Sequence, residues 1–452
     1  MESFFNKTAS LPHFEALQED VKTDVLIIGG GITGILCAYF LKERGVDCLL
    51  VEKDRLCQGV TGNTTAKITA QHGMVYDKLL KDAGLEKTKL YLEANWLAIR
   101  KYEELAAQID CDFAEKTAYV YSIEHPEKLE AEARAYRMLG LEDRIVETPE
   151  LPFATAGAVR MPNQAQFHPL KFLSALVKDL NIYEHTFVRE WKPNRAVTTQ
   201  GSITYQQVIF ATHFPIDNKH GLYFLKLYQH RSYVIALEHA AQLEGMYVSE
   251  DRKGLSFRNC GDLLFVGGGS HRTGKKGGNF QELRNFAKQY YPDAEERYAW
   301  AAQDCMPLDE APYIGPYSPA MPGCYVATGF RKWGMTSAMV SAMLLADMVQ
   351  GIDNPYAAVF DPSRNMFTGQ LMINGAQAMM NLLTPTTPRC PHMGCALKWN
   401  GAEHSWDCPC HGSRFTQEGR LLDNPANGDS EAAARKSAAD RKPWTGTWRK
   451  RE

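Results

Sequence analysis

The feature that most constrains the fold is a glycine-rich turn between a predicted strand and a predicted helix. Residues 23–28 form a short apolar run of strand length, and Gly-Gly-Gly-Ile-Thr-Gly follows directly at 29–34. Apolar side chains with helical spacing continue over 35–44, and a second apolar run at 46–52 ends in an acid. The order strand, glycines, helix, strand and acid predicts a βαβ unit of an α/β fold.

The spacing of the glycines indicates that this unit binds a dinucleotide. Gly29 permits the tight turn, Gly31 lets the backbone approach a pyrophosphate, and Gly34 lets the helix pack closely on the strand. The helix N-terminus favours the phosphates, and Glu52 is placed to accept hydrogen bonds from ribose hydroxyls. The motif alone does not distinguish NAD from FAD. Its position near the N-terminus, without a second copy downstream, favours a tightly held FAD.

The composition is that of a globular protein. The 452 residues include 44% hydrophobic and 23% charged residues, with a formal net charge of −3. This near-balance of charge gives no reason to expect nucleic acid as a partner. No apolar run approaches the roughly 20 residues of a membrane span. The N-terminal sequence lacks the basic start and apolar core of an export signal, so we expect a cytoplasmic protein.

The stretch after the second predicted strand resembles the D-amino-acid, glycine and sarcosine oxidase superfamily of FAD-dependent oxidoreductases. The matching residues are Glu-Lys-Asp-Arg at 52–55 and Gly-Val-Thr-Gly-Asn-Thr-Thr-Ala-Lys at 59–67. In that family this loop runs beneath the flavin, and its hydroxyl and backbone groups contact the pyrophosphate and the ring. The resemblance also places Lys67 where the family often has a basic residue near the flavin.

Later segments continue the resemblance. Residues 186–188 would hold the adenine, and the segment from 323 to 336 would place a helix N-terminus against the flavin. A helix dipole there stabilises an anionic reduced flavin. The cofactor-binding residues implied by the glycine motif and the resemblance are Gly29, Gly31, Gly34, Glu52, Lys53, Thr61, Thr64, Thr65, Val188, Gly329, Trp333, Gly334, Met335 and Thr336.

The resemblance covers residues 20–352 and implies a two-lobed, Rossmann-type α/β flavoprotein with an α+β substrate lobe. Charged, Ala/Leu/Glu-rich sequence over 76–150 predicts surface helices, and the alternating sequence of 222–270 predicts an antiparallel sheet. The expected ranges are about 20–75, 150–215 and 300–352 for the FAD lobe, and about 76–149 and 216–299 for the substrate lobe.

A cluster of cysteines and histidines near the C-terminus predicts a metal centre. Cys390-Pro-His392 and Cys408-Pro-Cys-His411 form two halves that each offer one thiolate and one imidazole. Two irons held by Cys₂ and His₂ are the ligation of a Rieske [2Fe–2S] cluster, and a tetrahedral zinc site is the alternative. The flanking residues resemble the Rieske proteins of cytochrome bc complexes. That resemblance implies an all-β domain over 385–428.

The same resemblance implies further features of the cluster domain. Cys395 and Cys410 match cysteines that form a disulfide in the respiratory proteins, although a reducing cytosol would oppose that bond. Phe415 replaces a tyrosine whose hydroxyl bonds the cluster environment, so we expect a lower potential. The domain is short, which predicts that its loops pack on the flavoprotein or on a partner subunit. Residues 430–452 are expected to form a disordered tail.

Several side chains are candidates for the substrate side of the flavin. Arg231 and Tyr233 could clamp a carboxylate, because a guanidinium binds two oxygens and a phenol adds a donor. Lys67, His72 and Lys332 are further catalytic candidates. Each of these side chains, like His168 and His271, has a structural role as its simpler interpretation. Cys305 raises the question of a covalently attached flavin.

The sequence thus predicts an FAD-dependent oxidoreductase fused to a Rieske domain. We expect it to oxidise a small amine or amino acid at the flavin and to pass electrons singly through the cluster to an acceptor protein. One alternative is a reductase or monooxygenase-like enzyme, with a donor protein supplying electrons through the cluster. Another is a redox sensor without turnover.

Overall fold

The glycine-rich βαβ unit lies in the centre of a six-stranded sheet. The computed structural model describes residues 2–142, 145–146, 149–218, 220–385 and 388–440. The strand order is β18-β19-β12-β2-β3-β8, with parallel pairing except between β18 and β19. Helices α2 and α8 pack against each other and against this sheet. The elements are β2 (Val25–Ile28), α2 (Ile32–Glu43), β3 (Cys48–Val51), β8 (Ile182–Tyr183), β12 (Gln207–Phe210), β18 (Tyr313–Pro316), β19 (Cys324–Thr328) and α8 (Gly334–Val349).

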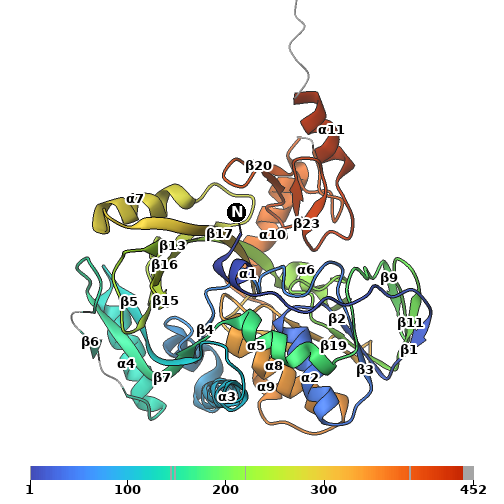
Figure 1. Cartoon of the computed structure of the whole chain (residues 1–452), viewed down its shortest axis with the longest axis horizontal. Coiled ribbons are helices and arrows are strands. Elements are labelled where there is room, and N and C mark those ends of the chain that lie inside the picture. The colour runs from blue at the N-terminus through green and yellow to red at the C-terminus, as the bar shows by residue number, and fades with distance from the viewer. Residues whose placement is uncertain (1, 143–144, 147–148, 219, 386–387, 441–452) are drawn as a thin grey trace, which may run out of the picture.

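A second, nine-stranded sheet lies beside the first (Figure 1). Its order is β17-β13-β16-β15-β14-β5-β7-β4, with β6 paired to β7. Helix α7 packs on β13 and β16, and the long helix α3 contacts α4 and α8. The elements are β4 (Lys67–Ile68), α3 (Val75–Ala106), β5 (Ala114–Ser122), α4 (Pro126–Met138), β6 (Ile145–Val146), β7 (Gly157–Gln166), β13 (Tyr228–Glu238), β14 (Met246–Ser249), β15 (Ser256–Cys260), β16 (Leu263–Arg272), α7 (Phe280–Tyr290) and β17 (Glu295–Met306).

Several strands of the nine-stranded sheet differ from the expectations. Strand β5 lies in the segment for which helices were predicted. Strands β4, β7 and most of β17 join this sheet, although residues 20–75, 150–215 and 300–352 were expected in the FAD lobe. These strands pair with partners that are remote in sequence. Local patterning does not reveal such pairing. The antiparallel sheet expected over 222–270 is confirmed by β13–β16.

Smaller elements complete the flavoprotein part. A four-stranded sheet of order β1-β11-β10-β9 packs beside the six-stranded sheet, and short helices connect the larger elements. These elements are α1 (Phe4–Thr8), β1 (Val21–Lys22), α5 (Pro169–Leu176), η1 (Val177–Asp179), β9 (Glu190–Lys192), β10 (Arg195–Val197), β11 (Ser202–Thr204), η2 (His220–Leu222), α6 (Tyr223–Lys226) and α9 (Ala357–Phe360).

The C-terminal domain is a small antiparallel sheet between two helices. The sheet has the order β20-β21-β22-β23, and the domain sits above the two large sheets in the view of Figure 1. Helix α11 forms where a disordered tail was expected from residue 430, and residues 441–452 lie outside the described part of the chain. No helix in the described ranges is long and apolar enough to cross a membrane. The elements are α10 (Gly369–Leu383), β20 (Lys398–Asn400), β21 (Ser405–Asp407), β22 (Arg414–Thr416), β23 (Leu421–Asp423) and α11 (Glu431–Asp440).

Candidate functional site

A cavity of about 2140 Å³ is lined by residues of both large sheets. It begins at the glycine turn after β2 and reaches the strands β13, β16 and β17 of the nine-stranded sheet. Ligand pockets typically measure roughly 300–1,000 Å³. The cavity is therefore large enough for a dinucleotide together with a small substrate.

The glycine turn forms one end of the cavity. Gly29 has a φ of +113°, and a Cβ on it would lie 2.6 Å from the Ala211 carbonyl oxygen. A Cβ on Gly34 would lie 1.9 Å from the Gly29 oxygen. Both positions therefore require glycine. Gly31 and Ile32, which begin α2, line the cavity with the positive end of that helix.

Two side chains hold this turn in place. The Glu52 carboxylate accepts a hydrogen bond from the Gly30 N–H at 2.7 Å, and burial raises the pKa of this carboxyl. The Thr61 hydroxyl accepts from the Ile32 N–H at 3.0 Å. Lys53 and Val188 also line this end of the cavity. This arrangement fits a dinucleotide whose phosphates lie on the turn and whose ribose lies near Glu52.

The loop after β3 leads to a buried lysine. The Thr64 hydroxyl accepts from the Ala66 N–H at 2.9 Å, and the Lys67 Nζ donates to the Thr65 hydroxyl at 3.3 Å. All three side chains that the resemblance assigned here, Thr64, Thr65 and Lys67, line the cavity. Burial lowers the pKa of Lys67 to about 7. Its side chain is therefore able to interconvert between the ammonium and the neutral amine near neutral pH.

The N-terminus of α8 forms another part of the wall, because Trp333, Gly334 and Met335 line the cavity. His72 stacks on the Trp333 ring, with 5.1 Å between ring centroids. Its Nε2 lies 2.9 Å from the Thr336 hydroxyl, and burial lowers the pKa of His72 to about 3. His72 is therefore neutral at ordinary pH and fixes the start of α8, whose positive end faces the cavity.

Lys332 lies beside an acid that the sequence did not single out. The Lys332 Nζ donates to the Ser270 hydroxyl at 2.7 Å, and both residues line the cavity with Asp304. Burial lowers the pKa of Lys332 and raises the pKa of Asp304, while the opposite charge of each partner counteracts these shifts. Strand β17 carries Asp304 to this place, and no local motif marks it.

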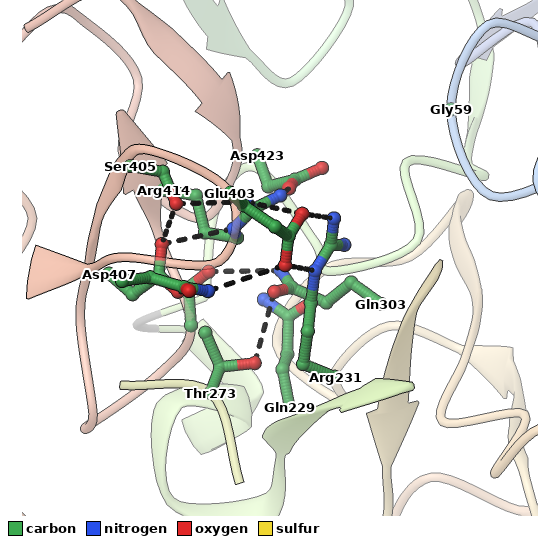
Figure 2. Close-up of polar contacts among 12 residues, drawn as sticks. Gly59, Gln229, Arg231, Thr273, Gln303, Glu403, Ser405, Asp407, Arg414 and Asp423 are labelled. Carbon is green, nitrogen blue, oxygen red and sulfur yellow. Dashed lines mark hydrogen bonds and ion pairs between the residues drawn. The ribbon is translucent and has the colours of Figure 1, made fainter. Parts of the chain in front are cut away.

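Arg231 and Tyr233, the predicted carboxylate clamp, both line the cavity, but Arg231 is paired with an acid of the C-terminal domain. The Arg231 Nε donates to the Glu403 carboxylate of the C-terminal domain at 2.8 Å, and a second guanidinium nitrogen contacts the same group (Figure 2). Tyr233 is buried two positions further along β13 and stacks on the His271 ring. Sequence reasoning could not assign Arg231 to an interdomain pair, because its partner lies 172 positions away.

Other predicted residues shape the site without lining the cavity. Gly34 packs against Gly29, and the Thr336 hydroxyl donates to the Thr69 carbonyl at 3.0 Å. Gly329, directly after β19, has a φ of +74°. His168 caps α5 and bonds the Thr8 hydroxyl, so its role is structural. Cys305, by contrast, lines the cavity as a free thiol, and burial raises its pKa to about 12.

The predicted cluster ligands come together between two loops of the C-terminal domain. The ring centroids of His392 and His411 lie 4.9 Å apart, and the Cys390 and Cys408 thiols share a hydrogen bond. Within the described residues, the buried Nδ1 of His411 has no hydrogen-bond partner. A buried nitrogen of this kind is available to a metal ion, so the four residues fit a two-iron cluster.

The surroundings of these ligands tie the cluster loops to the flavoprotein. Cys395 and Cys410 form a disulfide between the two loops, as the resemblance implied. The Nε2 of His392 lies 2.9 Å from the Asn218 side-chain oxygen, and the Gln229 side chain donates to the His411 carbonyl at 2.8 Å. The cluster loops were expected to pack on the flavoprotein or on a partner subunit, and these contacts show that they pack on the flavoprotein.

Comparison with known proteins agrees with this geometry. The sequence model of the FAD dependent oxidoreductase family matches residues 24–348, and that of the Rieske [2Fe-2S] domain matches residues 378–434. The chain belongs to the family of FAD-dependent oxidoreductases. It carries a C-terminal Rieske domain, so its cofactors are FAD and a [2Fe–2S] cluster, and the zinc alternative is set aside.

Known proteins resemble the whole chain or its flavoprotein part. A protein of Bacillus subtilis (strain 168) described as a Rieske 2Fe-2S iron-sulfur protein, YhfW, is 36% identical over 491 aligned residues, covering 94% of this chain and 96% of the relative. The structure of glycine oxidase from Geobacillus kaustophilus matches with a TM-score of 0.65 at 21% identity, over 76% of this chain and 99% of that one. L-Proline dehydrogenase from P. horikoshii matches with a TM-score of 0.65 at 17% identity, over 77% and 98%. At these identities the solved structures show the fold of the flavoprotein part.

Proposed function

We propose that this FAD-dependent oxidoreductase is a dehydrogenase that oxidises an amine or amino acid and delivers electrons singly to an external acceptor protein. When bound, FAD takes a hydride from a C–H next to an amine nitrogen, and the [2Fe–2S] cluster takes one electron at a time. The oxidised substrate leaves as an imine, which water hydrolyses to a carbonyl compound and ammonia or an amine.

The observation that carries this proposal is that the cavity and the cluster loops share a wall. Gln303 lines the cavity, and its side chain donates to the Gly412 carbonyl at 2.9 Å, next to the cluster ligand His411. Arg272 also lines the cavity and donates to the Pro409 carbonyl at 3.2 Å. One glutamine or one arginine thus separates the cavity from the cluster loops.

Three groups of this chain support oxidation of a substrate in the cavity. The positive end of α8 favours a negative charge that develops beside it, and so does Lys67 when it is protonated. Lys332, Asp304 and Ser270 face the same space from the nine-stranded sheet and the turn before α8, and they offer one cation, one acid and one hydroxyl to a polar substrate. His72, held neutral, orients α8 rather than exchanging protons.

The proposal is tested by anaerobic mixing of cluster-loaded protein with a panel of amines and amino acids. We expect flavin bleaching, followed by the electron paramagnetic resonance (EPR) signal of the reduced Rieske cluster. The matched variants are Cys408→Ser, which removes a cluster ligand, and Cys260→Ser, which changes a half-buried cysteine of β15. In the Cys408→Ser variant the flavin should bleach without the EPR signal of the cluster. The Cys260→Ser variant should behave as the wild type.

Two results would contradict the dehydrogenase. If no amine bleaches the flavin, but a reduced ferredoxin reduces first the cluster and then the flavin, electrons run in the opposite direction and the enzyme is a reductase. If both cofactors cycle with chemical reagents while no member of the panel is consumed, the chain is better described as a redox sensor.

A further inference from the structure

One wall of the FAD cavity is built by the Rieske domain rather than by the flavoprotein. Arg414 of β22, Asp423 of β23 and Asn424 line the cavity, and the chain remains in the wall as far as Asn427. These residues lie outside the range matched by the FAD-dependent oxidoreductase family, which ends at 348. The second domain therefore does more than carry the cluster.

This wall segment, residues 423–427, touches the flavoprotein next to the glycine turn. The Asn424 side-chain amide donates to the Thr212 carbonyl at 2.9 Å and to the Phe214 carbonyl at 2.6 Å. The Asn427 amide donates to the Ile216 carbonyl at 3.1 Å. Thr212 follows β12, the neighbour of β2 in the sheet, and Gly29 is packed against the preceding residue, Ala211.

The contact therefore lies at the diphosphate end of the cavity. The strand ends of β2 and β12 meet there, and the helix α2 starts there. Phosphates of a dinucleotide bind where such a helix begins. The Asn424 amide bridges the Thr212 and Phe214 carbonyls, which follow β12 next to this turn. It therefore fixes the wall segment beside the phosphate-binding turn.

A chain of ion pairs between two buried arginines and two half-buried acids holds the wall segment in place (Figure 2). The Arg414 guanidinium contacts Asp423 at 3.0 Å and Glu403 at 2.9 Å. Glu403 also binds Arg231 of β13, which belongs to the flavoprotein. Buried charges are tolerated only when they are paired, so each member depends on the others and on the docked position of the domain.

The two acids in this chain are kept ionised by their partners. The guanidinium groups of Arg231 and Arg414 lower the pKa of Glu403 against the effect of its burial. Arg414, together with Arg231 and Lys53, likewise lowers the pKa of Asp423. Arg414 also pairs with the buried Asp407 at 3.0 Å, so the two arginines serve three acids, and Lys53 adds a third cation near Asp423. The carboxylate of Asp423 therefore does not stand as an unopposed anion beside a diphosphate.

We propose that the Rieske domain forms part of the FAD-binding site, with the wall segment closing the diphosphate end of the cavity. FAD retention then depends on the Asn424 contacts and on the chain Arg231–Glu403–Arg414–Asp423. The inference goes beyond the proposed function, because it concerns binding of FAD and holds for any substrate and for either direction of electron flow.

The test is the rate at which the full-length holoprotein releases FAD, followed by the rise of flavin fluorescence after dilution. We expect Asn424→Ala to release FAD roughly tenfold faster than the wild type, because two hydrogen bonds across the wall are lost. The EPR signal of the cluster should remain unchanged. Asn424→Ser serves as a second, milder variant in case the alanine variant does not fold.

The matched control is Asn374→Asp. The Asn374 amide ties α10 to the flavoprotein by donating to the Leu225 carbonyl at 3.3 Å, and its side-chain oxygen accepts from the cavity-lining Arg272 at 2.9 Å. Asn374 itself does not line the cavity, and aspartate removes the donor to Leu225 while it keeps the acceptor for Arg272. We expect this control to release FAD at the wild-type rate. The proposal is overturned if both asparagine variants of the wall release FAD at the wild-type rate. It is also overturned if Asn374→Asp accelerates release as much as Asn424→Ala, because the interface would then act only through domain stability.

A second measurement tests whether FAD binding strengthens docking of the wall segment. Linkage requires that, if docking of the wall strengthens FAD binding, FAD binding strengthens docking by the same factor. We therefore expect hydrogen exchange at residues 421–427 to slow by roughly tenfold when the apoprotein is reconstituted with FAD. Equal exchange in the apo and FAD-loaded proteins would overturn the proposal.

Discussion

At the scale of the residue, burial sets the charge of several groups, and Glu132 of α4 is the clearest case. Its carboxyl accepts hydrogen bonds from the Tyr76 N–H at 3.0 Å and the Asp77 N–H at 2.8 Å, at the start of α3. These bonds favour the charged form, but burial opposes them more strongly and raises the pKa to about 8. The group therefore binds its proton more tightly in the folded protein than in the unfolded chain.

This pKa predicts a pH-dependent contribution to stability. Because the folded protein holds the proton of Glu132 more tightly, the free energy of unfolding falls as the pH rises from about 4.5 to about 8, by roughly 2–5 kcal/mol from this group. Glu132→Gln removes the titration. Denaturant unfolding of both proteins across this window should show the wild type losing stability relative to the variant. A constant difference between them would contradict the assignment.

A second residue-scale prediction concerns the potential of the cluster. Phe415 is fully buried in a core that includes Cys390 and Cys408. Phe415→Tyr adds a donor near the cluster, and a hydrogen bond of about 0.5–1.5 kcal/mol that favours the reduced form corresponds to roughly 20–60 mV for one electron. We expect the midpoint potential in an EPR-monitored titration to rise by this amount. Phe415→Leu, which adds no donor, should not raise it.

At the scale of the element, the contact between β2 and α2 depends on a glycine within the helix. A Cβ on Gly34 would meet the Gly29 oxygen at 1.9 Å, so Gly34→Ala must push the helix away from the strand. We expect the purified variant to hold far less FAD and to lose about 3 kcal/mol or more of stability. Flavin absorbance and thermal unfolding measure both effects.

Gly375→Ala is the control for that substitution. Gly375 lies inside α10, and a Cβ added to it would have no atom within 4 Å, so alanine there should add up to about 1 kcal/mol through helix propensity. Its FAD content should match the wild type. Equal FAD content in the Gly34→Ala variant would show that the close contact is not needed for binding.

Sequence patterns predicted those elements that are defined within one short stretch of the chain. The βαβ unit with Gly29 and Gly34 and the paired cluster loops each occupy one short stretch, and the structure has both. Strands β5, β7 and β17 could not be placed, because their sheet is defined by pairing over long sequence distances. Single side chains are limited in the same way by partners that are distant in sequence. Together with Tyr233, Arg231 suggested a substrate clamp, and only the folded chain shows Glu403 beside it.

At the scale of the whole molecule, the two domains form one unit through polar contacts at several places. Gln229 and Gln303 bind the cluster loop, Arg272 binds Asn374 of α10, and Arg231 binds Glu403. Many of these groups are buried, so separating the domains would leave charges and carbonyls without their partners. This cost predicts that the Rieske domain and the flavoprotein do not unfold independently.

The last prediction follows from this coupling. A ligand that binds only the folded protein stabilises it by about 2.7 kcal/mol at a concentration of 100 times Kd. If FAD binds against the wall segment, this stabilisation reaches the cluster as well. We expect the visible absorption of the Rieske cluster to be lost at least about 2 °C higher in FAD-saturated than in flavin-depleted protein. The Asn424→Ala variant should show a smaller shift. If the cluster is lost at the same temperature with and without FAD, the two cofactor sites are independent, and the close packing of the domains serves only to hold them together.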